Sequence, residues 1–294
     1  MVNEDFIKAG KIVAQAREYG RTLIKENASV LEIAEKVEKK ILDLGGKIAF
    51  PVDVSSNHIA AHDSPKYKDD RRLAKGDLVK LDLGVHINGD IVDTACTVEV
   101  GTTKYNEMIK TTEEALEKAI KILTPGTKIS EVGSIIEETI RKKQFSPIRN
   151  LSGHQIVNYI LHAGLTIPNY NNGNPTELKK GQIFAIEPFA TTGDGIVIEG
   201  KPSEVYGLIE EKPVRDANTK LILNFIKENY KTLPFSKRWI ANKFGLLKAN
   251  IALNTLEREG IVKQYMQLVE RSKCYVSQAE HTVVVAENPI VLTK

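Results

Sequence analysis

Two stretches of this sequence repeat the same pattern of apolar side chains and turn residues. Apolar residues at helical spacing recur at an offset of 99 residues, as Val30, Ile33, Val37 and Ile41 against Ile129, Val132, Ile136 and Ile140. Further along, residues 73–82 align with residues 178–187 at an offset of 105, and a Lys-Gly pair occupies the same place in both. Two unrelated edge strands with similar turns would explain part of this likeness. The whole pattern predicts two α-α-β halves related by a pseudo-twofold axis, each delivering a carboxylate at the same point.

The predicted elements give an α+β fold. Apolar periodicity predicts helices over residues 4–24, from residue 29 to the glycines at 45 and 46, over 105–123 and over 130–143. Segments rich in strand-forming residues follow each helix pair. A chain of 294 residues, 41% of them hydrophobic, has room for one large domain or two modest ones.

The second half is interrupted before it ends. Residues 221–226, 236–244 and 248–259 are expected to be helical, and a β segment starts at Gly260, an order that resembles a winged-helix unit. The prediction is therefore one domain formed by residues 1–201 and 273–294, with a winged-helix-like subdomain of residues 202–272 inserted into it.

A hairpin carries the clearest chemical signal. The Asn88-Gly89 pair between two strand-like runs is typical of a two-residue type I′ turn. Counting back from this turn places Asp93 opposite Gly84, so Asp82 and Asp93 lie diagonally on one face. Either aspartate alone would usually be a turn cap or one half of an ion pair. Two carboxylates on one buried face repel each other unless a proton or a cation lies between them.

Two further acids strengthen the case for a metal. Glu187 is the repeat equivalent of Asp82, and Glu280 lies in a valine-rich strand context. Four acids in apolar surroundings are hard to satisfy without about two divalent cations. Cys96 and Cys274 are widely separated and form no thiolate site, so His, Asp and Glu must hold any metal.

The histidines divide into two groups. His154 follows Ser152-Gly153, and His62 is close to the repeat equivalent of His162, at an offset of 100. A single histidine is more often a hydrogen-bonded structural residue than a ligand, and this interpretation is kept for the other three, His58, His86 and His281.

The ordered set Asp82, Asp93, His154, Glu187 and Glu280 resembles the five-ligand dinuclear site of the methionine aminopeptidase, prolidase and creatinase family, which has the pita-bread fold. The resemblance covers essentially the whole chain, and the insertion before Glu280 is similar to that of the type-2 methionine aminopeptidase branch in its archaeal form. The remaining motifs that carry it are Ala49-Phe50-Pro51, residues 57–62, Ser152-Gly153-His154, residues 184–188 and Ala279-Glu280-His281.

The resemblance implies a dinuclear metallopeptidase mechanism. Asp93 and Glu280 would bridge two divalent ions (Co, Mn, Fe or Zn), Asp82 would complete one shell, and His154 with Glu187 the other. A bridging water or hydroxide would be the nucleophile. Glu187 would shuttle its proton, while His62 and His162 would donate hydrogen bonds to the oxyanion or the leaving amide.

The implied reaction is removal of the initiator methionine from nascent proteins whose second residue is small. Phe50 and Tyr265 would line the methionine pocket, although Tyr265 fits an ordinary place in the core of the insert equally well. The alternatives are an X-Pro aminopeptidase or prolidase, which usually carries an extra N-terminal domain, and a non-enzymatic ribosome-binding relative, which would lack some metal ligands.

Charge and composition bear on partners and location. The formal net charge is only +3, but residues 215–273 contain twelve Lys and Arg against five Asp and Glu. This surplus is either a solvated surface that scaffolds the pocket or a face that docks on ribosomal RNA. No apolar run of about 18 residues occurs, so no membrane partner is expected. The chain is expected to be a cytoplasmic monomer.

Overall fold

The computed structural model describes residues 2–294. Four long helices confirm the helix predictions of the two halves: α1 (Glu4–Leu23), α2 (Val30–Asp43), α3 (Asn106–Lys121) and α4 (Ile129–Lys142). Asn3 caps α1 and Ser29 caps α2, each through a side-chain oxygen that accepts a backbone N–H of the first turn.

In the first half, α1 and α2 pack on one face of a three-stranded antiparallel sheet. Its strands are β1 (Lys47–Ser56), β3 (Leu78–Ile87) and β4 (Asp90–Glu99), in the order β1-β3-β4. The β3–β4 hairpin pairs Ile87 with Asp90 and Gly84 with Asp93, which confirms the register counted from the Asn-Gly turn. Apolar side chains of α1, α2 and the sheet form one core cluster.

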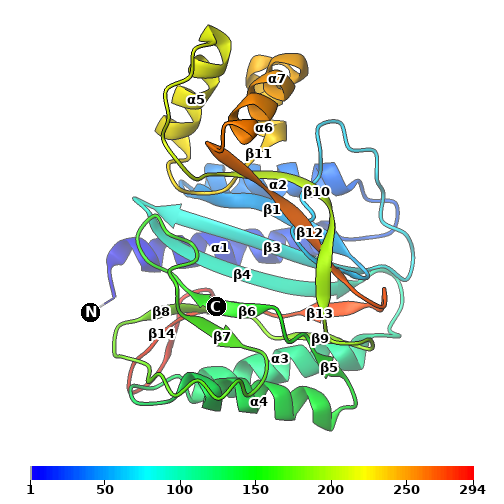
Figure 1. The fold of residues 1–294 in the computed structure, drawn as a ribbon. Coiled ribbons are helices and arrows are strands. Elements are labelled where there is room, and N and C mark those ends of the chain that lie inside the picture. Colours follow the sequence, from blue (N-terminus) through cyan, green and yellow to red (C-terminus); the bar gives the residue numbers. More distant parts are fainter. Residues whose placement is uncertain (1) are drawn as a thin grey trace.

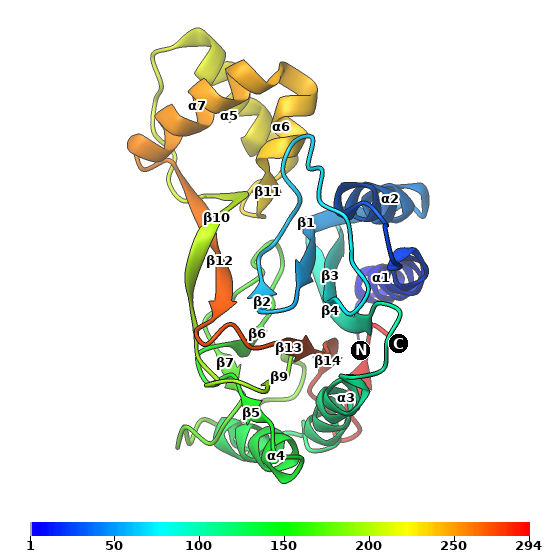
Figure 2. The same ribbon diagram turned by 90° about the vertical axis from the view of Figure 1, so that its right-hand side faces the viewer.

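In the second half, α3 and α4 pack against two sheets made of short strands, with the helices outside and the strands toward the molecular centre (Figure 2). The five-stranded sheet has the order β15-β14-β8-β6-β7, and the three-stranded sheet has the order β13-β9-β5. Their bounds are β5 (Ser146–Pro147), β6 (Ser152–Gln155), β7 (Thr166–Pro168), β8 (Ile183–Ile186), β9 (Phe189–Thr191), β13 (Val276–Gln278), β14 (His281–Val284) and β15 (Ile290–Val291).

The turns that precede β3 and β8 repeat the same hydrogen bonds. The N–H of Gly76 donates to the Val100 carbonyl, and the N–H of Gly181 donates to the Val285 carbonyl. Both glycines have a positive φ, 89° and 85°, a conformation that disfavours side chains. The same turn geometry therefore starts the acid-bearing strand of each half.

Residues 202–272 form most of a separate lobe, coloured yellow to orange in Figure 1. Two long strands, β10 (Val197–Leu208) and β12 (Val262–Glu270), carry it and pair with each other, with β11 (Phe235–Ser236) and β2 (Ile59–Ala61) at the two edges. Helices α5 (Ala217–Asn229), α6 (Lys237–Phe244) and α7 (Leu246–Arg258) confirm the three predicted helices. Their apolar faces form a core cluster of their own.

Among the helices of residues 2–294, none combines the length and the apolar composition that crossing a bilayer requires.

Substitutions at two neighbouring positions of α2 test how much core packing stabilises the first half. Ile41 is fully buried in its core, whereas Leu42 is 54% exposed. We expect Ile41→Ala to lower the free energy of unfolding by about 2–5 kcal/mol, because it leaves a cavity, and Leu42→Ala to change it by about 0.5 kcal/mol. Chemical denaturation measures both, and equal effects would contradict the packing described.

Candidate metal centre

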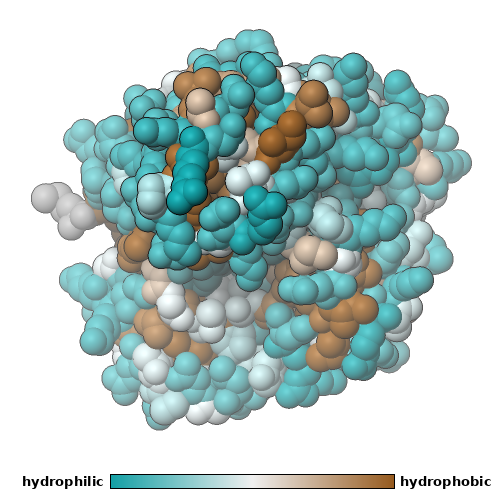
Figure 3. Space-filling model, turned by 45° about the horizontal axis from the view of Figure 1, so that its top comes forward, coloured by the Kyte–Doolittle hydropathy of each residue, from teal (hydrophilic) through white to brown (hydrophobic). Residues whose placement is uncertain are grey.

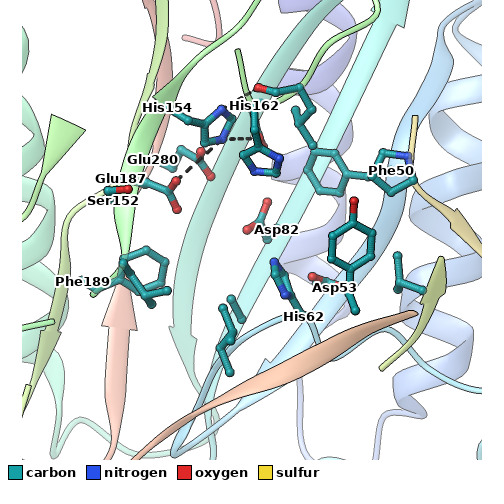
Figure 4. Close-up of a pocket in the computed structure, with 18 of the residues that line it drawn as sticks. Phe50, Asp53, His62, Asp82, Ser152, His154, His162, Glu187, Phe189 and Glu280 are labelled. Atoms are coloured by element: carbon teal, nitrogen blue, oxygen red, sulfur yellow. Dashed lines mark hydrogen bonds and ion pairs between the residues drawn. The ribbon is translucent and has the colours of Figure 1, made fainter. Parts of the chain in front are cut away.

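One cavity of about 260 Å³ brings together all nine predicted site residues. They are Phe50, His62, Asp82, Asp93, His154, His162, Glu187, Tyr265 and Glu280. In Figure 4, Glu187, Glu280 and His154 lie on one side of this cavity and Phe50 on the other, with Asp82 and His62 between them. Residues far apart in the sequence thus form a single site.

The carboxylates and His154 come from neighbouring strands of the two halves. Asp82 lies in β3, Asp93 in β4 and His154 in β6, while Glu187 follows β8 and Glu280 precedes β14. The Glu280 N–H donates to the Ala95 carbonyl of β4. The Thr282 hydroxyl is within 2.8 Å of the Asp93 carbonyl. These bonds join β14 to β4, so acids of both halves meet at the centre.

His154 is oriented as a ligand. Its Nδ1 lies 2.7 Å from the Leu161 carbonyl, which can only accept, so Nδ1 carries the proton and Nε2 keeps its lone pair. Nε2 lies 3.6 Å from Asp93 Oδ2 and 3.7 Å from Glu187 Oε1. Ligand atoms of Asp93, His154 and Glu280 lie within 4.8 Å of one another. A ring held at one nitrogen with the other free is the usual arrangement of a metal-binding histidine.

Burial and mutual repulsion dominate the electrostatics of the cluster. Burial first, then neighbouring carboxylates, holds the pKa values of Asp82, Glu187 and Glu280 well above their usual range. Burial also raises the pKa of Asp93 to about 7, while a hydrogen bond with Asp82 opposes the rise. Burial lowers the pKa of His154 to about 4. The acids therefore favour protons or cations between them, and the imidazole stays neutral.

These residues fit a divalent metal. Asp82 Oδ1 and Asp93 Oδ1 are buried with no hydrogen-bond partner among residues 2–294, although buried carboxylate oxygens are normally satisfied. Four carboxylates and one imidazole supply oxygen and nitrogen ligands, a set that suits divalent ions such as Mn²⁺, Fe²⁺, Co²⁺ and Zn²⁺. A cation would satisfy the orphaned oxygens and neutralise the repulsion between the acids.

Gln278 belongs to the centre and was missed in the sequence. Its side-chain nitrogen lies 3.2 Å from Asp82 Oδ2 and 3.5 Å from oxygens of both Glu187 and Glu280. Strand alternation could have found it, because Gln278 is two residues before Glu280. Its amide donates toward three carboxylates and so helps to hold them close together.

Asp53 was also missed. Its carboxyl is buried in the cavity wall, Oδ1 has no partner among the described residues, and its backbone pairs with that of Asp82. Burial, followed by the charges of Asp82 and Asp63, holds its pKa well above the usual range. The signal was an acid inside the apolar run Val52-Asp53-Val54. The carboxyl group of Asp53 therefore adds a polar group to the apolar part of the cavity wall.

His62 faces the cavity with a defined tautomer. Its Nδ1 lies 3.2 Å from the Met266 carbonyl, so this nitrogen donates and Nε2 is an acceptor in the neutral ring. Burial lowers the pKa of His62, which keeps the ring neutral. The Tyr265 ring packs edge-on against it with centroids 5.9 Å apart. The structure therefore places Tyr265 in the cavity wall.

Comparison with known proteins identifies the family. Residues 4–287 match the model of metallopeptidase family M24. A methionine aminopeptidase of Pyrococcus abyssi is 45% identical over 291 residues, covering 99% of this chain and 98% of the relative. The chain belongs to metallopeptidase family M24 and is a metalloenzyme of the hydrolase class.

Solved structures show the same fold. A methionine aminopeptidase of Thermotoga maritima aligns with a TM-score of 0.73 at 24% identity, over 100% of this chain and 98% of that one. A thermophilic Arx1 aligns with a TM-score of 0.87 at 14% identity, over 98% and 90% of the two chains. At these identities the likeness establishes the pita-bread fold alone.

Metal affinity should rise with pH. A cation must displace the protons that the raised pKa values place on the acids, so raising the pH through about 7 removes a competing proton from Asp93. His154 is neutral throughout this range and adds no pH dependence. We expect roughly tenfold tighter binding at pH 8 than at pH 6, measured by calorimetry with Mn²⁺. An affinity that is flat or falls with pH would contradict this account.

Proposed function

We propose that this member of family M24 is a methionine aminopeptidase that removes the initiator methionine from nascent proteins when the second residue is small. The observation that carries the proposal is the convergence of the five ligand-type residues on one cavity with an apolar side. Close similarity to archaeal proteins named methionine aminopeptidase over nearly the full chain supports it.

The five residues would hold two divalent cations. Asp93 and Glu280, both buried and close to His154, would contribute ligands to both ions. Asp82 would complete one shell, and His154 with Glu187 the other. Metal ions bound by these residues would supply an activated water and an electrophile for the scissile carbonyl. Orphaned oxygens on Asp82 and Asp93 support ligand roles for both.

Three side chains would move or hold protons. The Glu187 carboxylate takes a proton from the attacking water and delivers it to the leaving amine. His62, with Nδ1 held on Met266, presents Nε2 as an acceptor, so we assign it the scissile N–H rather than the oxyanion. His162 lies in the same cavity, its ring centroid 4.3 Å from that of His154, and would donate to the oxyanion.

The methionine side chain would lie against the apolar part of the cavity. Phe50 and Tyr265 line it from two separate segments, and Leu161 and Phe189 add further apolar surface. Burying the thioether against such side chains stabilises binding by about 1.5–3 kcal/mol. The arrangement supports Phe50 and Tyr265 as substrate-binding residues.

The finer architecture is also a proposal. The repeated hydrogen bonds of Gly76 and Gly181 support a pseudo-twofold relation between the halves. The separate core of α5, α6 and α7 supports treating residues 202–272 as an inserted, winged-helix-like subdomain within a catalytic domain of residues 1–201 and 273–294. The division at residue 202 falls inside β10.

The basic lobe supports a ribosomal partner. Lys220, Lys243, Lys248, Arg258 and Lys263 are exposed on it, and hydrophilic side chains dominate this side of the molecule, with a few apolar patches (Figure 3). Phosphate contacts through such residues would make association with ribosomal RNA fall steeply with salt. We place the enzyme in the cytoplasm as a monomer, where nascent chains emerge.

A metal-reconstitution assay tests the proposed function. The chelated protein is titrated separately with Co²⁺, Mn²⁺, Fe²⁺ and Zn²⁺ and assayed on Met-Ala-Ser and on a matched X-Pro peptide. We expect release of methionine with at least one metal and little cleavage of X-Pro. Preference for X-Pro would favour a prolidase-type enzyme, and no activity under any metal would overturn the proposal.

The two cavity histidines should matter for turnover and not for folding. We expect His62→Ala and His162→Ala to retain the fold and metal stoichiometry but to lose about 100-fold or more in kcat, because each removes a polar contact to the reacting amide. His58→Ala is the matched control, since His58 does not line the cavity. Normal turnover in either cavity variant would remove its assigned role.

A further inference from the structure

The inserted lobe contributes part of the cavity wall. Val205, Pro234 and Tyr265 lie between residues 202 and 272 and line the same cavity as the metal-type ligands. Strand β11, which directly follows Pro234, pairs with β10, and in Figure 2 the lobe lies above β1 and β2. The shape of the cavity therefore depends on how the lobe is fixed to the main domain.

A buried ion pair is one of the connections between the lobe and the main domain, beside the pairing of β12 with β2. Arg238 of α6 is 2% exposed, and its guanidinium donates from Nη2 to Glu38 Oε1 (2.7 Å) and from Nη1 to Glu38 Oε2 (3.0 Å). The neighbouring Trp239 donates its indole N–H to Glu38 Oε2 at 3.1 Å. Glu38 belongs to α2 and is itself buried. We call these three residues the Glu38 anchor; it joins two segments 200 positions apart in the chain.

Through Val52, the anchor contacts the part of the cavity wall formed by β1. Strand β1 has a register shift between Phe50 and Asp53, so Val52 lies in a bulge. The Val52 N–H points to Glu38 Oε1 at 3.4 Å, and the Val52 carbonyl accepts from the Ser64 hydroxyl at 3.2 Å. Side chains outside the strand therefore hold the bulge, and Phe50 and Asp53 on either side of it line the cavity.

The anchor also reaches the loop that carries His62. Arg238 Nε donates to the Pro65 carbonyl at 3.3 Å, three residues after His62. His62 has a φ of 61°, a left-handed conformation that is uncommon for a residue with a side chain. Such a backbone persists only where its surroundings hold it, and the contacts at Ser64 and Pro65 lie directly after it.

We propose that Glu38 and Arg238 are positioning residues of the active site, which fix the Phe50–Asp53 bulge and the His62 loop relative to the inserted lobe. They touch neither the metal-type ligands nor the cavity. They act by fixing the position of the bulge that contacts the substrate side chain and of the loop that contacts the scissile amide. The proposed effect on catalysis rests on the proposed aminopeptidase function, whereas the effect on the two segments does not.

The chemistry of buried ion pairs allows a clean test. Removing one partner leaves an unpaired buried charge, which destabilises the fold, so an effect on activity could not be assigned to positioning. Replacing both partners by apolar residues of similar size is often neutral for stability. The double variant Glu38→Leu/Arg238→Met therefore removes the contacts to Val52 and Pro65 and retains a packed interface. Glu38→Asp is the conservative variant, because it keeps a carboxylate charge opposite the buried guanidinium of Arg238.

Lys237→Met provides the matched control. Lys237 precedes Arg238 in α6 and forms an ion pair with Glu204 at 3.1 Å within the lobe, with no contact to Glu38. Its removal costs one ion pair but leaves the anchor intact. Any difference between the double variant and this control can therefore be assigned to the anchor.

The experiment combines hydrogen exchange with steady-state kinetics on the metal-loaded full chain. In the double variant we expect amide exchange in residues 49–54 and 62–66 to be about tenfold faster than in Lys237→Met. We also expect KM for Met-Ala-Ser to rise about tenfold and kcat to fall by less than in His62→Ala, with metal stoichiometry unchanged, because the anchor holds both the Phe50–Asp53 wall and the His62 loop. Glu38→Asp should show much smaller changes than the double variant in both measurements.

Two results would overturn the proposal. Unchanged exchange in both segments would show that the anchor does not hold them, whatever the activity. A lower melting temperature with normal exchange and normal KM would show that it only stabilises the fold. If the wild type fails to release methionine but the double variant still exchanges faster in both segments, the positioning stands and the proposed function fails.

Discussion

Four carboxyl groups share one poorly solvated site, and the cost of bringing Asp82, Asp93, Glu187 and Glu280 together governs the rest of the structure. Burial and mutual repulsion raise their pKa values, so the site is unfavourable unless protons or cations lie between the acids. Only a rigid framework can hold side chains in such an arrangement. The helix-backed sheets of the two halves provide it. Asp82 lies in the central strand β3, and Glu187 and Glu280 lie next to β8 and β14, which are paired on both sides. Asp93 lies in the edge strand β4, which the backbone bond from Glu280 to Ala95 fixes against the other half.

Hydrogen bonds next to the acidic residues connect the two halves of the framework. The backbone of Glu280 binds that of Ala95, and the hydroxyl of Thr282 binds the backbone of Asp93. Displacing one half would therefore move a ligand. A backbone carbonyl also orients His154: its Nδ1 lies 2.7 Å from the Leu161 carbonyl, directly before His162 in the chain.

The lobe of residues 202–272 contributes residues to the site itself. Its strands β10 and β12 bring Val205 and Tyr265 to the cavity, and the Met266 carbonyl selects the tautomer of His62. A lobe with its own core could otherwise move as a unit. The Glu38 anchor opposes this motion with a guanidinium fork, whose planar geometry fixes orientation as well as distance.

Local rules of the chain determined a large part of this picture. The Asn88-Gly89 turn fixed the hairpin register and hence the pairing of Gly84 with Asp93, because a two-residue loop leaves one favourable alignment. Apolar periodicity located the helices, and the hairpin and the repeat indicated a cluster of acids. The resemblance of the motifs to a known family added His154 and implied the full ligand set. Tertiary structure alone decided which distant residues meet. Strand alternation and an apolar run mark Gln278 and Asp53 as candidates, but their contacts with Asp82 join segments that no local pattern relates. The same holds for Arg238 against Glu38. The proton position on His62 depends on a carbonyl 204 residues away.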